Sequence, residues 1–332
     1  MLNSTPSRIT FGLSLTLGII IATSSNSWFT SWLGLELNLL SFIPIISSSF
    51  NSYSSEAALK YFLIQALGST IILISASSMW LFTANPSLLI LSALLLKMGA
   101  APVHFWFPLI MQGVSWMHCI ILMTLQKIAP LVLVSYTTVS PISTLMIQVS
   151  SCLSALVGAI GGLNQTLLRK ILAYSSINHM GWMLASILLS SDVFFTYILI
   201  YSIVSSSVVL LLNSNQIFHF KQMSSIYNMK TKTASFMSLF SLGGLPPFLG
   251  FIPKLLVITL LANSNLIMWL LLLLSGSLIT LFYYTRIVLT ALTLSSPKLK
   301  PSLSFKTKLP SYTLAFINFT PLMFPLMSFY QF

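Results

Sequence analysis

The feature that most constrains the fold is a succession of apolar runs, most of them about 20 residues long, separated by short polar segments. Charged residues make up 5% of the 332-residue chain, whereas soluble domains contain about 25%. Because lipid offers no hydrogen bonds to the backbone, apolar runs of this length cross a membrane as helices. The sequence therefore predicts an all-α transmembrane protein, and it excludes both a soluble globular fold and a disordered chain.

The apolar runs predict eleven helices in one integral membrane domain that occupies residues 1–332. The predicted spans are residues 9–25, 27–48, 57–83, 86–110, 114–138, 141–163, 170–190, 193–213, 234–262, 265–293 and 310–330. Pro102 interrupts the fourth span, and the run from Gly243 to Pro247 interrupts the ninth. Two Pro/Gly-broken helices five spans apart indicate two inverted five-helix repeats, over residues 9–138 and 141–293, followed by a C-terminal helix at 310–330.

Positive charges are distributed unevenly between the loops of this chain, which has a formal net charge of +12. If the ninth run is a single interrupted span, one side of the membrane receives twelve Lys and Arg residues and the other receives none. The twelve are Arg8, Lys60, Arg169, Lys170, Lys221, Lys230, Lys232, Arg286, Lys298, Lys300, Lys306 and Lys308. This asymmetry predicts an N-terminus on the inner side and a C-terminus on the outer side. Since the charges are spread singly between apolar runs, we expect no nucleic-acid partner.

The sequence lacks the common motifs for metal, nucleotide and covalent chemistry. Cys119 and Cys152 lie inside apolar runs without CxxC or Cys/His spacing, so we expect no disulfide, zinc site or iron–sulfur cluster. There is no GxGxxG, P-loop, HExxH or GxSxG motif. We therefore expect that this chain binds no cofactor and performs no bond chemistry by itself.

Four ionisable residues lie deep inside apolar runs rather than at their edges: Glu36, Lys97, Lys127 and Lys254. A charge at the centre of a membrane helix costs about 2.5–3.5 kcal/mol, which is roughly 10–14 kcal/mol for four. Structural explanations are available, because Glu36 can neutralise one lysine and long lysine side chains can extend to the membrane surface. Three lysines cannot all pair with one acid, however, and buried groups that gain and lose protons can pass protons through a membrane.

Two histidines also lie inside predicted spans, and one of them is close in sequence to Lys97. His104 follows Lys97 by seven residues, which on a continuous helix places both on one face and about 10 Å apart. His179 lies in the seventh span, where its imidazole can exchange a proton or can hold two helices together by a hydrogen bond. We predict that the two histidines and the four charged residues form a pathway for protons.

Six segments between residues 28 and 260 combine charged residues, His, Gly or Pro with apolar surroundings. They are residues 32–44 (WLGLELNLLSFIP), 56–63 (EAALKYFL), 96–108 (LKMGAAPVHFWFP), 126–130 (QKIAP), 161–182 (GGLNQTLLRKILAYSSINHMGW) and 243–254 (GGLPPFLGFIPK). In order and residue type these segments closely resemble the subunit 2 family of NADH dehydrogenase. That family comprises antiporter-like membrane subunits of mitochondrial respiratory complex I.

The resemblance implies a proton-translocating subunit of NADH:ubiquinone oxidoreductase in the mitochondrial inner membrane. The N-terminus would lie on the matrix side and the C-terminus on the intermembrane-space side. NADH, FMN, iron–sulfur clusters and ubiquinone would be bound by other subunits of complex I. The partners would be those subunits, neighbouring antiporter-like subunits and the lipid bilayer. Because bacterial relatives have three further leading helices, partner subunits would cover one flank of this chain.

The resemblance also implies a role for each residue of the predicted pathway. Glu36 would be the membrane carboxylate, Lys97 its paired modulating lysine and Lys127 the central proton-carrying lysine. Lys254 would face the outer half-channel or the neighbouring subunit, and the two histidines would lie on a hydrated axis.

Two other functions are compatible with broken membrane helices that contain lysine. A cation/proton antiporter subunit would transport sodium without NADH dehydrogenase partners. A purely structural membrane spacer would gain nothing from four costly buried charges, so the sequence gives it poor support.

Overall fold

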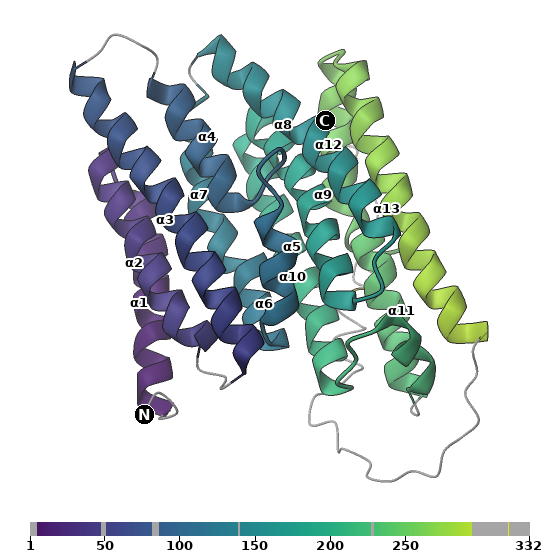
Figure 1. Ribbon diagram of the computed structural model, residues 1–332. Helices are drawn as coiled ribbons and strands as arrows, with labels where there is room; N and C mark the ends of the chain where they lie inside the picture. The colour runs from purple at the N-terminus through teal and green to yellow at the C-terminus, as the bar shows by residue number, and fades with distance from the viewer. Residues whose placement is uncertain are drawn as a thin grey trace.

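The computed structural model describes residues 5–47, 51–81, 86–138, 140–226, 229–293 and residue 318. In this part of the chain, thirteen α-helices and one 3-10 helix form a bundle in which most helices run side by side (Figure 1). Seven helical stretches are long and apolar enough to cross a membrane, which confirms the all-α transmembrane class.

The bundle has two halves. The first contains α1 (Thr5–Ser24), α2 (Trp28–Ser47), α3 (Ser52–Leu81), α4 (Pro86–Met98), α5 (Trp106–Gly113), α6 (Trp116–Met123) and α7 (Leu125–Tyr136). The second contains α8 (Pro141–Leu163), α9 (Leu168–Leu189), α10 (Ser191–Ser214), η1 (Phe220–Ser225), α11 (Met229–Gly243), α12 (Phe251–Asn263) and α13 (Ile267–Thr293).

Ten of the eleven predicted spans fall within the described residues, apart from residues 48, 82 and 83. Seven of them correspond to one helix each, namely α1, α2, α3, α8, α9, α10 and α13. The fourth, fifth and ninth spans are each divided into two helices: α4 and α5, α6 and α7, and α11 and α12. The predicted C-terminal helix at 310–330 lies outside the described residues except for Asn318.

The fourth and ninth spans, whose breaks the sequence predicts, share a backbone motif at the end of their first helix. α4 ends before Gly99 (φ 72°), and α11 ends before Gly244 (φ 80°). Each glycine adopts a left-handed conformation that other residues rarely take. The residue after each glycine donates its amide to a carbonyl in the preceding turn: Ala100 to Leu95, and Leu245 to Phe240. This Schellman motif satisfies carbonyls at the end of each half-helix.

The fifth span is divided at Thr124, a break that hydropathy does not predict. Thr124 has φ −111° and ψ −78°, and its hydroxyl donates to the carbonyl of Ile120 over 2.7 Å. Threonine hydroxyls that bond to the preceding turn bend helices. The break places Lys127 in the first turn of a new helix, α7.

Helix α9 lies at the centre of the bundle. It packs against helices of both halves, namely α5, α7, α8, α10, α12 and α13 (Figure 1). Its sequence includes Asn178 and His179, and residues 175–186 are all buried. The polar side chains of α9 therefore face protein rather than lipid, which is the environment that polar groups in a membrane require.

The order of packing in the second half parallels that in the first. α1 packs against α2 and α7, and α8 packs against α9 and α13. In each half the second helix contacts the third, and the third contacts both pieces of the broken helix. A Cβ atom at Gly34 would lie 2.5 Å from the Ala22 nitrogen, and one at Gly158 would lie 2.5 Å from the Asn178 nitrogen. Glycine thus allows close approach of the first two helices in both halves.

Large apolar side chains cover the outside of the bundle. Examples of exposed residues are Leu13, Leu17, Phe29, Leu63, Leu67, Leu145, Leu278 and Phe282. On a soluble monomer so much apolar surface would favour association, whereas bilayer lipids solvate it. The exposed surface therefore agrees with an integral membrane protein.

Basic residues gather at one end of the bundle. α1 and α9 begin there, α13 ends there, and η1 lies at the same end (Figure 1). The described basic residues on this side are Arg8, Lys60, Arg169, Lys170, Lys221, Lys230, Lys232 and Arg286. Asp192, in the first turn of α10, lies at the opposite end. The other four lysines of the loop prediction, between residues 298 and 308, lie outside the described residues.

Candidate functional site

The three lysines that the sequence places inside spans are buried, with 5% of Lys97, 3% of Lys127 and 4% of Lys254 exposed. They lie on α4, α7 and α12. α4 packs against α7, and the central helix α9 contacts both α7 and α12. Each lysine lies in its own group of polar or aromatic residues, and α9 connects the second group to the third.

Glu36 and Lys97 form the first group, between α2, α3 and α4. The Lys97 side chain runs along α3, where a Cβ atom at Gly68 would lie 2.9 Å from Lys97 Cγ. The charges of Glu36 and Lys97 act on each other, but their nitrogen and oxygen atoms are not within 4.0 Å. Among the described residues, the one ion pair at that distance joins Glu56 to Lys60 on the exposed surface of α3. Glu36 Oε2 is buried without a hydrogen bond.

A chain of hydrogen bonds leads from this first group toward α7. Tyr61 Oη donates to Gln126 Oε1 over 3.1 Å, and Gln126 Nε2 donates to Asn38 Oδ1 over 3.0 Å. The charge of Glu36 also acts on Tyr61. Because Gln126 directly precedes Lys127, the chain reaches from α2 and α3 to the second group.

Lys127 lies where the two halves of the bundle meet. Its Nζ donates to the carbonyl of Ser176 in α9 over 3.3 Å. Nζ also lies 4.8 Å from the ring centre of Phe107 in α5 and 5.6 Å from that of Tyr201 in α10. One carbonyl and two aromatic faces therefore stabilise the ammonium group. A lysine held in this way can release its proton without leaving an unpaired carboxylate behind.

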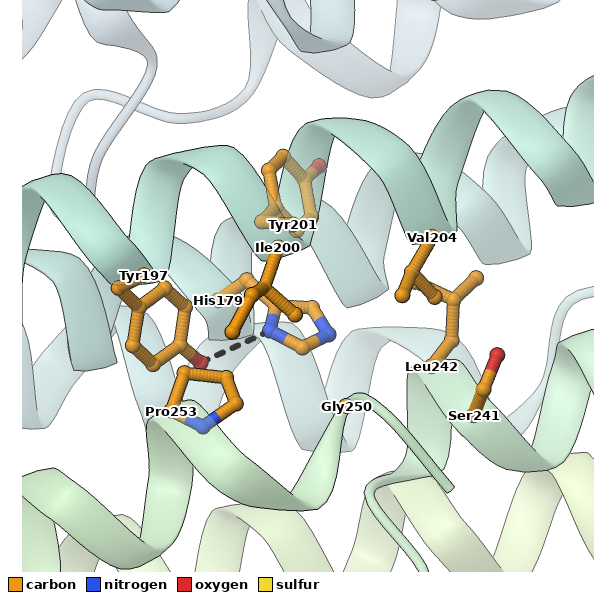
Figure 2. Close-up of a pocket in the computed structure, with 9 residues that line it drawn as sticks. All are labelled: His179, Tyr197, Ile200, Tyr201, Val204, Ser241, Leu242, Gly250 and Pro253. Atoms are coloured by element: carbon orange, nitrogen blue, oxygen red, sulfur yellow. Dashed lines mark hydrogen bonds between the residues drawn. The ribbon is translucent and has the colours of Figure 1, made fainter. Parts of the chain in front are cut away.

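His179 lies on the other side of Tyr201, in the middle of α9. Its Nδ1 is 3.0 Å from the Tyr197 hydroxyl, and its ring centre is 5.0 Å from that of Tyr201 (Figure 2). The charges of Lys254 and Lys127 both act on the imidazole. Its second ring nitrogen points away from Tyr197 (Figure 2). His179 therefore makes a hydrogen bond that joins two helices, and it also lies close enough to two lysines to be affected by their charge.

Two small cavities adjoin Tyr201. The first lies beside His179, Tyr197, Ser241 and Pro253 (Figure 2). The second lies beside Thr124, Lys127, Met183 and Ser202. In each cavity the centre of a water molecule can occupy about 10 Å³. Each cavity therefore has room for about one water.

Lys254 closes the break between α11 and α12. Its Nζ donates over 2.8 Å to the carbonyl of Gly243, the last residue of α11. The C-terminal end of a helix carries partial negative charge, so it is a favourable partner for an ammonium group. The side chain bends back into the break, where a Cβ atom at Gly244 would lie 2.9 Å from Nζ. Lys254 therefore does not extend to the membrane surface.

His104 is not placed as the sequence predicts. α4 ends at Met98, so His104 lies in the connecting segment and not on the same helical face as Lys97. The prediction was wrong because the left-handed Gly99 ends the helix five residues before His104. The His104 ring is buried, and its Nδ1 is 3.2 Å from the carbonyl of Pro102. Within the described residues, no hydrogen bond joins this ring to the predicted lysines.

Several residues of the site were not identified from the sequence. Asn38, Tyr61 and Gln126 form the hydrogen-bond chain, and Tyr197 and Tyr201 surround His179. A signal was available for the two tyrosines, because a spacing of four residues places both on one face of a helix. Gln126 could have been noticed as the polar neighbour of Lys127.

Asn318 had no such signal. Its carbonyl accepts from the Leu249 amide over 3.1 Å, and its side-chain amide donates to Ser207 Oγ over 3.2 Å. Leu249 belongs to the segment between α11 and α12, so Asn318 packs on the break that Lys254 closes. Contact between residues so far apart in the chain cannot be inferred from local patterns.

The part of the chain that the structure describes contains no group of three or more His, Cys, Asp or Glu residues that could hold a metal ion. Cys119 is buried and Cys152 is half-buried, and both are free thiols. What the site offers chemically is a series of groups that can bind and release protons.

Comparison with known proteins identifies the family. The family model described as "NADH:quinone oxidoreductase/Mrp antiporter, TM" matches residues 25–88 and 84–280, which is more than half of the chain. The chain belongs to this family of membrane proteins. Its curated relatives include proteins named NADH-ubiquinone oxidoreductase chain 2. The protein from Anopheles gambiae is 46% identical over 92% of each chain, and the protein from Aedes aegypti is 47% identical over 83% of each chain.

Two solved structures have the same fold. A chain of respiratory complex I from Thermus thermophilus superposes with a TM-score of 0.81 at 24% identity, and the match covers 97% of this chain and 80% of that chain. A chain of the Mrp complex from a Dietzia species superposes with a TM-score of 0.78 at 20% identity, and covers 89% of this chain and 61% of that chain. These two likenesses confirm the fold of the chain, and the family model and the relatives named NADH-ubiquinone oxidoreductase chain 2 confirm the family resemblance.

Proposed function

We propose that this chain is an antiporter-like core membrane subunit of NADH:ubiquinone oxidoreductase and contributes to proton translocation across the mitochondrial inner membrane. NADH oxidation and ubiquinone reduction take place in other subunits, which bind NADH, FMN, iron–sulfur clusters and ubiquinone. This chain takes part in the enzyme without a redox site of its own. The mosquito relatives that are named NADH-ubiquinone oxidoreductase chain 2 support the proposal.

The observation that carries the proposal is the way in which the buried lysines are partnered. Lys127 and Lys254 each donate to a backbone carbonyl, and within the described residues neither has a carboxylate within 4.0 Å. Hydrogen bonds between two ionised groups are stronger than those to a neutral acceptor. A carbonyl therefore favours the charged form of lysine less than a carboxylate would, and the ammonium can give up its proton.

Glu36 and Lys97 would control this exchange. They are near each other without direct contact, and the attraction between two charges inside a protein depends strongly on their separation. A redox-driven movement that changes this separation alters the electrostatic potential at Lys127. Lys127 then takes up or releases a proton, and a released proton passes by way of His179 to Lys254. We assign no step to His104, because its ring bonds to its own connecting segment.

We further propose that the end of the bundle rich in Lys and Arg faces the matrix. The N-terminus would then lie on the matrix side and the C-terminus on the intermembrane-space side, in agreement with the positive-inside rule. The parallel packing of the two halves supports a single membrane domain with inverted repeats at about 9–138 and 141–293. The partners are other complex I subunits, including neighbouring antiporter-like subunits, and bilayer lipids.

The proposal is tested by Lys127→Met in the assembled complex. Methionine keeps the volume of the side chain and removes the group that exchanges protons, so we expect a several-fold loss of NADH-driven proton uptake by membrane vesicles. Lys60→Met is the matched control, because Lys60 is exposed and paired with Glu56 at the surface. Normal proton uptake by the Lys127 variant, at an equal amount of complex on a native gel, would refute the role of Lys127.

One alternative has an observation in its favour, namely the similarity to a chain of the Mrp complex. A cation/proton antiporter subunit would show sodium-dependent transport in membranes that lack NADH dehydrogenase. Comigration of the chain with an NADH-oxidising assembly on a native gel, together with proton uptake independent of sodium, would exclude this alternative.

A further inference from the structure

Tyr201 stands between Lys127 and His179, although no sequence motif marks it. The Lys127 Nζ atom lies 5.6 Å from the centre of its ring, and the centre of the His179 ring lies 5.0 Å away. Tyr201 lines both small cavities, one together with Lys127 and the other together with His179. It is therefore the residue that the second and third lysine groups share.

The Tyr201 hydroxyl is buried and has no hydrogen bond within the described residues. The Ser176 side chain lies near it. A buried hydroxyl without a partner is unfavourable, so it gains by turning toward a polar group or a water. In Figure 2 the hydroxyl points away from His179, which means that the side chain must turn before it can face the imidazole.

Polar residues are among those that line each cavity. On one side they are Lys127, Thr124 and Ser202. On the other side they are His179, Tyr197 and Ser241. Each cavity has room for about one water, which is enough to bridge a hydroxyl and a neighbouring nitrogen.

We propose that the Tyr201 hydroxyl is the link through which protons pass between Lys127 and His179. The inference rests on the proposed function, because it requires that Lys127 carries protons. The hydroxyl oxygen accepts a proton from the Lys127 ammonium, through one water, as its own proton passes to His179. The oxygen holds one proton before and after the step, while Lys127 becomes neutral and His179 becomes positively charged. His179 then gives the proton to a neutral Lys254.

The turning of the side chain makes this link intermittent. When the hydroxyl points away from His179, the aromatic ring separates the two cavities. When the hydroxyl faces His179, the two cavities are connected through one oxygen atom. A barrier that opens only in this way limits the return of protons to Lys127.

Tyr201→Phe in the assembled complex tests the inference. Phenylalanine keeps the ring, its packing and its contact with the Lys127 ammonium, and removes only the hydroxyl. Tyr283→Phe is the matched control, because Tyr283 is fully buried on α13 and its hydroxyl also lacks a hydrogen bond in the described part of the chain. Rates of NADH-driven proton uptake in H₂O and in D₂O are measured for both variants and for Lys127→Met.

We expect Tyr201→Phe to lower the rate several-fold and to raise the ratio of the rates in H₂O and D₂O, because proton transfer then limits turnover. Tyr283→Phe should match the wild type in both measurements. If Lys127→Met is impaired while Tyr201→Phe has the rate and isotope ratio of the wild type, the inference about Tyr201 is wrong and the proposed function stands. If the complex with Lys127→Met takes up protons at the wild-type rate, the proposed function itself is refuted.

Discussion

Single residues in this bundle show how a membrane protein can keep lysine away from water. The Lys127 ammonium is held by the Ser176 carbonyl and by the faces of Phe107 and Tyr201. Such contacts accept a cation and also tolerate a neutral amine, since carbonyls and aromatic rings carry no net charge. We therefore propose that the chemistry of the site depends on the ability of the side chain to lose a proton and not only on its positive charge.

Lys127→Arg separates these two properties. The guanidinium group keeps the positive charge and can contact the same rings, but it does not release its proton in proteins. We expect the assembled Arg variant to lose proton uptake several-fold, as the Met variant does. Lys60→Arg, on the exposed surface of α3, should have no effect. Proton uptake at the wild-type rate in Lys127→Arg would mean that a fixed charge is sufficient.

The sequence allowed these ionisable residues to be selected because charge inside an apolar run is costly and therefore conspicuous. Glu36, Lys97, Lys127, Lys254 and His179 all lie where helices meet. Tyr201 could not be selected in the same way, because an aromatic residue in an apolar span has no cost that would mark it. The role that we propose for it rests on contact with Lys127, which is more than seventy residues away in the chain.

The broken helices determine where two of the lysines lie. In α4 the lysine precedes the break, and in α12 it follows the break, yet each is adjacent to the C-terminal end of a half-helix. Gly99 and Gly244 make these ends possible through positive φ angles. The sequence predicted both breaks from Gly and Pro, whereas the break at Thr124 rests on one side-chain hydrogen bond to the backbone and has no such signal.

Gly244→Ala should disturb the second break. A Cβ atom there would lie 2.9 Å from Lys254 Nζ, and alanine at a φ of 80° is strained by about 1–2 kcal/mol. We expect lower thermal stability of the complex and slower proton uptake. Gly243→Ala is the neighbouring control, because the nearest atom to its Cβ would lie 3.6 Å away. Equal behaviour of the two variants would contradict the proposed geometry of the Lys254 hydrogen bond.

The whole molecule combines a basic end, an apolar exterior and a polar interior. Arg169 and Arg286 tie segments together at the basic end by donating to the carbonyls of Val114 and Leu163. The sequence predicted that the basic residues gather at one end, because Lys and Arg in alternate loops can be counted without knowing how the helices pack. It could not predict that α9 is central, since that depends on contacts between helices of both halves.

Cysteine labelling tests the proposed orientation. Asp192 and Lys221 are exposed at opposite ends of the bundle, so each can be replaced by cysteine without disturbing the core. In intact mitoplasts, an impermeant maleimide should label Asp192→Cys but should reach Lys221→Cys only after the membrane is opened. Labelling of both variants in detergent is the control for access, and the wild type gives the background from Cys119 and Cys152. The reverse pattern would mean that the basic end faces outward.

The most direct test of a proton pathway through these groups is a map of ordered water in the assembled complex, obtained by high-resolution cryo-electron microscopy. We expect water density in both cavities beside Tyr201, within hydrogen-bonding distance of Lys127 on one side and of His179 on the other. Apolar packing that leaves Lys127, His179 and Lys254 in dry, separate pockets would contradict proton transfer along this chain and would leave it a structural role.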